Sequence, residues 1–246
     1  MKLRVCLRLI RIVFYLGLLS LAVTLMFGRL SRFFPNRKKI ITFMFRRCNS
    51  ILNIKLEVTG TPTDKPSLWV ANHVSWMDIV ILGSFHPLDF IAKKEVAAWP
   101  VIGKISQRVG AIFVDRTNKF AAYRTSLPAL QDRMKSGQPV VVFPEGTTSV
   151  GEDTLPFKPM FYQAAIRENM LVQPISLQYL QSNRQISRAL PFIDDDDFLT
   201  SLIRVLKEKE TIVRVHFQPA VSASEWHRKQ LAKDHEQTIA TDLQAA

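Results

Sequence analysis

A histidine and an aspartate in the segment NHVSWMD, residues 72–78, have the types and the spacing for general-base chemistry. Four residues separate His73 from Asp78. On one ideal helix, five positions turn the chain by about 500 degrees, which would leave the two side chains well apart. We therefore expect His73 in a loop and Asp78 on the first turn of the following helix. The carboxylate would then orient the imidazole while its other nitrogen takes a proton from a hydroxyl.

The same segment also fits a purely structural role. Ser75 is a good N-cap, and together with Asp78 it matches a capping box. This arrangement would account for both residues without any catalysis. The segment by itself leaves the two interpretations open.

Two further segments carry polar side chains where predicted strands end. Arg116 follows the strand predicted at 111–114, and a guanidinium suits a phosphate because it can donate two parallel hydrogen bonds. A surface ion pair with Asp115 is the alternative. The segment PEGTTS at 144–149 combines turn-forming Pro and Gly with Glu145 and three hydroxyls. It could hold a polar headgroup or form an ordinary turn.

The elements that must position these loops begin after about Pro66, where short β-rich runs alternate with helical stretches. This alternation predicts an α/β domain over 61–246, with a mixed, largely parallel sheet flanked by helices. In such sheets ligands bind where strands end and loops begin. The predicted strands are 67–71, 89–92, 111–114, 139–143, 171–177 and 211–217, and the predicted helices are 76–85, 96–109, 120–136, 159–169, 200–209 and 223–243.

The positive charge of the chain is concentrated in its first 60 residues. Of a formal net charge of +12, this arm carries +11, from 12 Lys and Arg and one acidic residue. Residues 12–28 are uncharged and would form a helix about 26 Å long, slightly shorter than a hydrocarbon core of roughly 30 Å. Residues 40–54 resemble an amphipathic helix that lies in a membrane interface. We therefore expect residues 1–60 to be a membrane-anchoring helical arm.

The arm could be a single span or an in-plane hairpin. Basic residues flank the apolar run on both sides, which favours a shallow anchor on the cytoplasmic face over a simple span. A secretory signal peptide is the competing interpretation. No small-x-small cleavage site follows the apolar run, and basic charge resumes at once, which argues against it.

Composition excludes several function classes. Residues 61–246 are nearly neutral, so the folded domain lacks the basic surface that nucleic-acid binding requires. No GxSxG nucleophile elbow is present, which argues against a serine lipase. Two cysteines cannot make a disulfide framework, and no spacing typical of a metal site occurs. An enzyme and a non-catalytic membrane lipid-binding protein both remain open at this point.

The three loops, taken in order, resemble the blocks of the glycerophospholipid acyltransferase family, which contains the 1-acylglycerol-3-phosphate acyltransferases. NHVSWMD at 72–78 is similar to the family's NHxSxxD block, GAIFVDR at 110–116 to its second and FPEGTTS at 143–149 to its third. An apolar strand with a proline, VQPISL at 172–177, represents the fourth. The connecting stretch FIAKKE at 90–95 also looks like the family. The resemblance covers about residues 66–180.

The resemblance implies transfer of a fatty acyl group from a thioester, on coenzyme A or acyl carrier protein, to the free hydroxyl of a lysophospholipid. The acceptor implied first is 1-acylglycerol-3-phosphate, which would give phosphatidic acid. The hydroxyl would attack the thioester directly, so Ser75 need not be a nucleophile. No bound cofactor and no metal are implied. The expected partners are membrane lipids and the acyl donor, without nucleic acid.

The resemblance also assigns roles to individual residues. His73 would be the general base of the His-x4-Asp motif and Asp78 its orienting partner. For substrate binding, it implies Arg116 for the acceptor phosphate and Glu145 with Gly146 for the headgroup. From their residue types alone, Thr147 could help to hold a headgroup, and Lys93 could contact phosphate or the donor.

One position departs from the family pattern. Many members have an arginine in the third block where this chain has Thr148. Loss of that cation removes a potential two-point phosphate contact. A lyso-ornithine lipid or another lysophospholipid could therefore be the acceptor instead.

Overall fold

The computed structural model describes residues 2–28, 30–99, 101–114, 119–193 and 195–245. Within these ranges the strands form one eight-stranded sheet in the order β1-β7-β6-β2-β5-β3-β4, with β8 beside β6. Only β6 with β7 and β6 with β8 are antiparallel pairs, and the others are parallel. The strands are β1 Ile54–Gly60, β2 Ser67–Ala71, β3 Asp89–Lys93, β4 Ala111–Val114, β5 Val140–Val142, β6 Leu171–Leu180, β7 Thr211–Phe217 and β8 Val221–Ser222.

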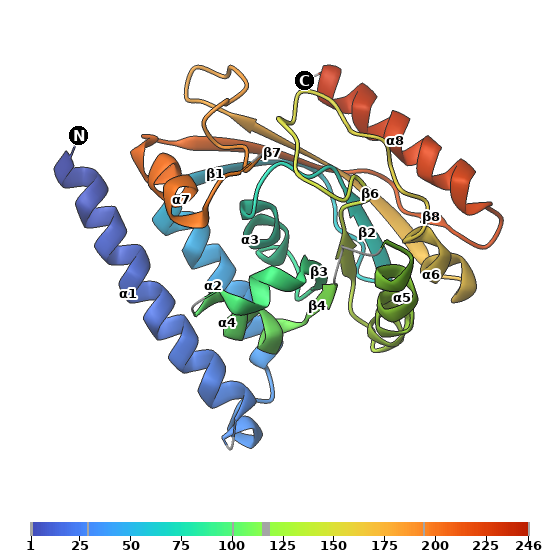
Figure 1. Cartoon of the computed structure of the whole chain (residues 1–246), viewed down its shortest axis with the longest axis horizontal. Helices are drawn as coiled ribbons and strands as arrows, with labels where there is room; N and C mark the ends of the chain where they lie inside the picture. The colour runs from blue at the N-terminus through green and yellow to red at the C-terminus, as the bar shows by residue number, and fades with distance from the viewer. Residues whose placement is uncertain (1, 29, 100, 115–118, 194, 246) are drawn as a thin grey trace.

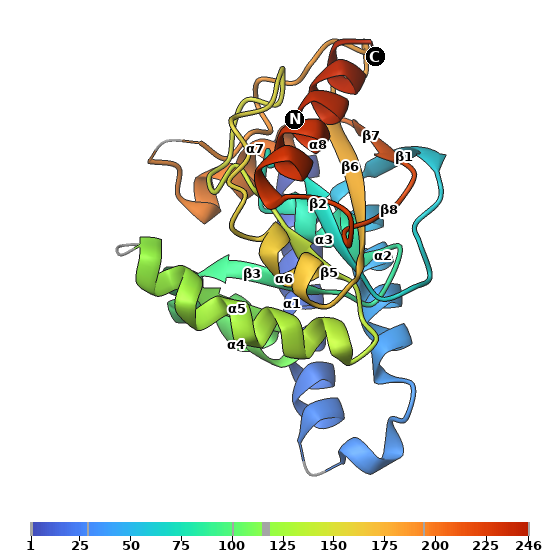
Figure 2. The ribbon, with the colours of Figure 1, turned by 90° about the vertical axis from the view of Figure 1, so that its right-hand side faces the viewer.

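Helices cover both faces of the sheet (Figures 1 and 2). Helices α5, α6 and α8 pack on one face, where Leu68, Val70 and Val142 meet Leu130 and Leu231. Helices α1, α2, α3, α4 and α7 lie on the other side of the sheet (Figure 1). The helices are α1 Lys2–Phe27, α2 Arg37–Leu52, α3 Met77–Gly83, α4 Ile102–Val109, α5 Lys119–Lys135, α6 Tyr162–Arg167, α7 Phe198–Lys207 and α8 Arg228–Gln244, with short 3-10 helices η1 Ser31–Phe33 and η2 Lys94–Ala98.

This architecture confirms the predicted fold class, a mixed and largely parallel sheet flanked by helices with a helical N-terminal arm. The strands predicted at 67–71, 111–114 and 211–217 have the predicted bounds. Strand β1 was missed because its side chains are mostly half-buried or exposed, so it lacks a continuous apolar run. It nevertheless pairs with β7 from Ile54 to Gly60, and these residues of the expected arm therefore belong to the sheet.

The helix predicted at 96–109 was wrong, because the chain forms η2 and α4 there with a break between them. Trp99 has an extended backbone, with φ −67° and ψ 130°. It precedes Pro100 in the sequence, and a residue before proline is disfavoured in the helical region. The break brings Trp99 to a different position from the one a continuous helix would give.

The N-terminal helices pack on the domain along much of their length. Helix α1 is 26 residues long and extends beyond the predicted apolar run. Val23 and Met26 are buried with Ile41 of α2 and Ile105 of α4. The segment Leu3–Phe27 is long and apolar enough to cross a membrane by length and composition. Its outward side exposes large apolar side chains: Leu3, Leu7, Ile10, Val13, Phe14, Leu18, Leu21 and Leu25.

Candidate active site

The loop after β2 carries His73 at the centre of the sheet. Strand β2 is buried throughout and lies between β5 and β6, so the loop that follows it leaves from the middle of the sheet. Asn72 binds β6 through both ends of its amide: Nδ2 donates to the Leu177 carbonyl at 2.9 Å, and the Leu177 N–H donates to Oδ1 at 2.8 Å. This pair fixes the point at which the chain leaves the sheet.

His73 lies in the loop and Asp78 on the first turn of α3, as their spacing requires. His73 Nδ1 is 2.7 Å from Asp78 Oδ2. The same oxygen accepts hydrogen bonds from the N–H groups of Val74 and Ser75 at 2.9 and 3.0 Å. An ionised carboxylate only accepts, so Nδ1 carries the hydrogen and Nε2 is left as the proton acceptor. This is the geometry of an oriented general base.

Only one of the two hydrogen bonds of the predicted capping box is present. Asp78 accepts the Ser75 N–H, but α3 begins after Trp76 and no side chain caps it. The Ser75 hydroxyl is buried and makes no hydrogen bond within the described part of the chain. Instead of a serine cap, the Asp78 carboxylate accepts the N–H groups of Val74 and Ser75 before the helix begins.

The segment 143–149 packs directly against His73. Phe143 stacks on the imidazole, with ring centroids 3.9 Å apart and planes 13° from parallel. Glu145 Oε1 accepts the His73 N–H at 3.0 Å, and the Ser149 N–H donates to the His73 carbonyl at 2.8 Å. Because β5 runs parallel to β2 and beside it, the two loops leave the sheet together.

Glu145 is a buried structural neighbour of the dyad. Its side chain is 3% exposed. Burial raises the pKa of this carboxyl to about 8, against the opposing effect of the His73 N–H. Gly146 follows with φ +75°, a region that glycine adopts without strain. Neither residue lines the pocket described below, whereas Thr147 does.

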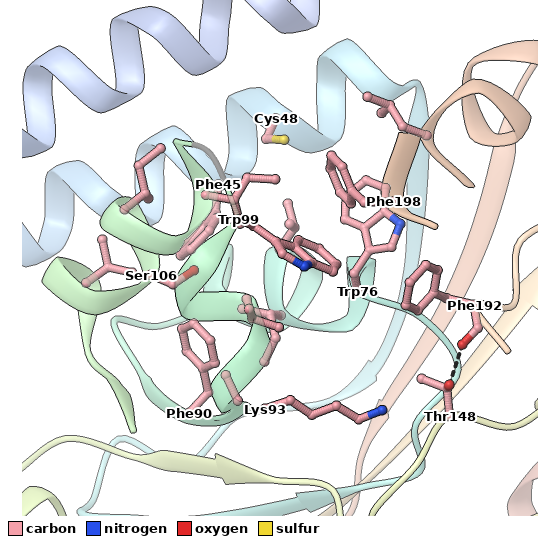
Figure 3. Close-up of a pocket in the computed structure, with 18 of the residues that line it drawn as sticks. Phe45, Cys48, Trp76, Phe90, Lys93, Trp99, Ser106, Thr148, Phe192 and Phe198 are labelled. Carbon is pink, nitrogen blue, oxygen red and sulfur yellow. Dashed lines mark hydrogen bonds between the residues drawn. The ribbon is translucent and has the colours of Figure 1, made fainter. Parts of the chain in front are cut away.

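An apolar pocket of about 670 Å³ opens beside His73. It is enclosed by α1, α2, α3, β3, η2, α4 and α7. Figure 3 shows its aromatic side chains, with Trp76, Trp99 and Phe198 grouped together. The rings of Trp76 and Trp99 lie 5.1 and 5.2 Å from that of Phe198. The lining also includes Lys93, whose side chain runs towards Thr148 (Figure 3).

The structure brings together the predicted site residues that it describes. His73, Glu145, Gly146 and Thr147 lie in two adjacent loops, Asp78 lies on the first turn of α3 beside them, and Lys93 reaches the pocket from β3. Arg116 lies outside the described residues. Among the residues that are described, no group of three or more His, Cys, Asp or Glu could hold a metal ion.

Several residues of the site were missed in the sequence. Tyr179 donates to Asp78, and Asn72 holds the loop, but both are single polar residues beside apolar strands. Trp76 and Phe143 line the pocket, and Phe143 is also part of the buried core, whereas Trp69 is fully buried. An aromatic residue at a strand end is compatible with either position, so the sequence carried no signal to separate them.

Thr148 has a role that the sequence did not suggest. Its hydroxyl donates to the Phe192 carbonyl, and the Phe192 N–H donates to the Val74 carbonyl at 2.9 Å. These bonds attach the segment before α7 to both loops of the site. Phe192 thereby closes one side of the pocket (Figure 3).

Comparison with known proteins agrees with this geometry. A sequence model described as Acyltransferase matches residues 55–178, half of the chain, and this stretch contains the dyad and both loops. The chain belongs to the acyltransferase family. This confirms the resemblance drawn from the four sequence blocks and identifies the protein as an enzyme.

Individual acyltransferases are similar over most of the chain. A lyso-ornithine lipid O-acyltransferase of Pseudomonas aeruginosa is 32% identical over 83% of this chain and 78% of its own length. A 1-acyl-sn-glycerol-3-phosphate acyltransferase of Neisseria meningitidis is 33% identical over 81% of this chain and 78% of its own. The crystal structure of a 1-acyl-sn-glycerophosphate acyltransferase, PlsC, from Thermotoga maritima has the same fold, with a TM-score of 0.64, 21% identity and 97% coverage of both chains.

Proposed function

We propose that this acyltransferase moves a fatty acyl group from an acyl thioester to the free hydroxyl of a lysophospholipid. The observation that carries the proposal is the His73–Asp78 pair, whose histidine lines an apolar pocket. The pair supplies a base for a hydroxyl, and the pocket supplies an apolar environment for a chain. A pocket of this volume lies within the range of small-molecule sites.

In the proposed reaction, His73 Nε2 takes the proton of the acceptor hydroxyl as its oxygen attacks the thioester carbonyl carbon. Asp78 holds the ring through Nδ1 and stabilises the imidazolium that forms. The tetrahedral intermediate then collapses, the carbon–sulfur bond breaks, and the thiolate leaves with the proton from His73. No acyl-enzyme is required, which agrees with the buried position of Ser75.

The acyl chain of the donor would occupy the apolar pocket. Each methylene that it buries contributes about 0.8 kcal/mol. Lys93 and Thr147, both in the lining, are suited to the polar end of the substrates near His73. Glu145 would act indirectly by holding the His73 backbone, and Arg116 is proposed for the acceptor phosphate.

Acceptor identity is the second part of the proposal. We take 1-acylglycerol-3-phosphate as the first candidate because Arg116 and Lys93 are cations suited to phosphate. Lyso-ornithine lipid is the second candidate. It is favoured by Thr148, which is uncharged and whose hydroxyl donates to the Phe192 carbonyl. The name of the Pseudomonas relative also favours it.

The outward side of α1 is proposed to lie in the cytoplasmic leaflet of a membrane. Exposed apolar side chains on α1, with Phe33 and Phe43 nearby, would be costly in water. Basic residues of the arm would contact anionic headgroups. The inward side of α1 lines the pocket through Ile12, Leu16 and Leu19, so we expect α1 to stay with the enzyme and to lie along it.

A panel of lysolipid acceptors tests the proposal. The full-length enzyme in detergent micelles would be assayed with acyl-coenzyme A and with acyl carrier protein thioesters, against 1-acylglycerol-3-phosphate, lyso-ornithine lipid and other lysophospholipids. We expect transfer to at least one acceptor, abolished in His73→Ala. Absence of transfer to every lysolipid from both donors would refute the proposal.

A further inference from the structure

Arg8 of α1 lies at the C-terminal end of α7. Its Nη1 donates to the Leu206 and Glu208 carbonyls at 3.1 and 2.5 Å, and its Nη2 donates to the Lys209 carbonyl at 3.1 Å. Arg4, one helical turn earlier, donates to the Lys207 carbonyl at 2.8 Å. Two arginines of the anchor helix thus bind four consecutive carbonyls around the last turn of α7.

Two of these carbonyls, those of Leu206 and Lys207, are in the last turn of α7, and the other two follow directly after it. The last carbonyls of an α-helix have no partner within the helix, and the negative end of its dipole lies there. A guanidinium can bond several carbonyls at once and also complements the dipole. The arginines are therefore specific ligands of the end of α7, beyond any contribution to the basic charge of the arm.

The two helices that Arg8 connects are also two walls of the pocket. Ile12 lines the pocket one turn beyond Arg8 on α1. On α7, Phe198 and Leu202 line it and are themselves four residues apart, hence on one side of the helix. Ile12 is 2% exposed and packs in the same cluster as Leu202 and Leu206. A change in the position of α1 relative to α7 would thus change the pocket.

We propose that Arg8 is a positioning residue that joins the anchor helix to α7 and so sets the shape of the acyl pocket. It acts through α1 and α7 and touches no reacting atom. The proposal rests on the proposed function, in which the pocket holds the acyl chain of the donor. It goes further by making the membrane helix a component of donor binding.

Arg11 provides a matched control. It lies on the same helix, carries the same charge, is exposed, and makes no hydrogen bond within the described part of the chain. Arg8→Met and Arg11→Met therefore remove the same charge from the membrane arm. Only Arg8→Met removes hydrogen bonds between α1 and the end of α7, where the Arg4 bond to the Lys207 carbonyl remains. A difference between the two variants therefore measures the effect of the Arg8 contacts, because the change in charge is the same in both.

The first measurement is steady-state kinetics of the full-length enzyme in micelles. We expect Arg8→Met to raise the KM for the acyl thioester by about tenfold, the equivalent of one charge-assisted hydrogen bond, with kcat little changed. Arg11→Met should match the unmodified enzyme. Two results would overturn the proposal. One is a lower kcat at unchanged KM in Arg8→Met, which a smaller folded fraction would produce. The other is the same KM in Arg8→Met and Arg11→Met.

The second measurement needs no acyl transfer. Cys48 lines the pocket and is buried, whereas Cys6 is exposed. In a Cys6→Ser background, N-ethylmaleimide should modify Cys48 faster in Arg8→Met than in Arg11→Met. Equal modification rates in the two variants would overturn the proposal about Arg8, whatever the outcome of the acyl-transfer assays. Failure of every lysolipid as a substrate would refute only the proposed function. Arg8→Lys, which keeps one donor group, replaces Arg8→Met if the latter does not fold.

Discussion

Tyr179 donates its hydroxyl hydrogen to Asp78 Oδ1 at 2.5 Å, the carboxylate oxygen that His73 does not contact. Asp78 is fully buried, and both of its oxygens are hydrogen-bonded. Tyr179 lies on β6, and its fixed strand position therefore sets the orientation of the carboxylate and, through it, of the imidazole. The acid of the dyad is held by the central sheet as well as by its own helix.

Replacement of Tyr179 by phenylalanine tests this relationship. Tyr179→Phe leaves one buried carboxylate oxygen without its partner, at a cost of about 1–3 kcal/mol. We expect lower stability and a kcat reduced by about tenfold with an unchanged KM, because only the orientation of His73 is loosened. Kinetics and urea unfolding on the same samples measure both effects. A kcat equal to that of the unmodified enzyme would contradict the role given to Tyr179.

Asp78→Asn tests the dyad itself. An amide at this position cannot stabilise the imidazolium and can favour the wrong tautomer, so we expect kcat to fall by at least about 100-fold. The chain offers a control in His216 and Asp242, which form a second histidine–aspartate pair at 2.8 Å between β7 and α8. Asp242→Asn should leave turnover unchanged. Similar losses in the two variants would mean that the effect is structural.

The pocket predicts a response to donor chain length. Ser106 of α4 lines the pocket and has a small side chain (Figure 3). Ser106→Trp fills part of the volume, so we expect turnover with long acyl chains to fall more than turnover with short ones. Ser106→Ala is the control and should keep the original preference. An unchanged chain-length profile in Ser106→Trp would argue against this pocket as the acyl site.

His235 predicts acid sensitivity of the fold. It is buried on α8 beside Tyr162, with ring centroids 5.6 Å apart, and burial lowers its pKa to about 4. In the unfolded chain, histidine has a pKa of about 6.5, so the unfolded state binds a proton first. Stability should therefore be complete above about pH 6.5 and fall by up to about 3 kcal/mol as the pH approaches 4.

Urea unfolding between pH 4.5 and 7.5 measures this dependence. His235→Leu removes the titrating group and keeps an apolar side chain in the same place. The variant should lose less stability over this range than the unmodified enzyme. If the free energy of unfolding falls equally with pH in the two proteins, His235 is not the cause of the acid sensitivity.

The exposed side of α1 predicts that membrane binding can be weakened by mutation without unfolding the protein. Phe14 and Leu21 are 66% and 57% exposed, so replacing both by glutamine should cost little packing. We expect vesicle binding to weaken by at least about tenfold, since each change removes apolar surface worth more than 1 kcal/mol in the membrane. Vesicle flotation measures binding, and circular dichroism checks the fold. Unchanged flotation would place the membrane contact elsewhere.

The sequence alone determined the fold class, the central strands, the dyad and the family. These are local properties: the apolar run of β2 marks a buried parallel strand, and the spacing of His73 and Asp78 allows one pairing geometry. The order of the four blocks then identified the family, because the residues within each block occur close together in the chain. The helix predicted at 96–109 was wrong, although Pro100 offered the signal for the break.

Only the tertiary structure decided what surrounds the dyad. Tyr179 reaches Asp78 across 101 residues of chain, Thr148 reaches Phe192 across 44, and Arg8 reaches Leu206 across 198. The pocket has the same origin, since its walls include α1 near the N-terminus and α7, which lies far from it in the sequence. Such contacts depend on which faces meet when strands and helices pack, and a single sequence specifies this through the sum of many weak interactions. The pairing of His73 with Asp78 could therefore be predicted from local spacing, whereas the shape of the site could not.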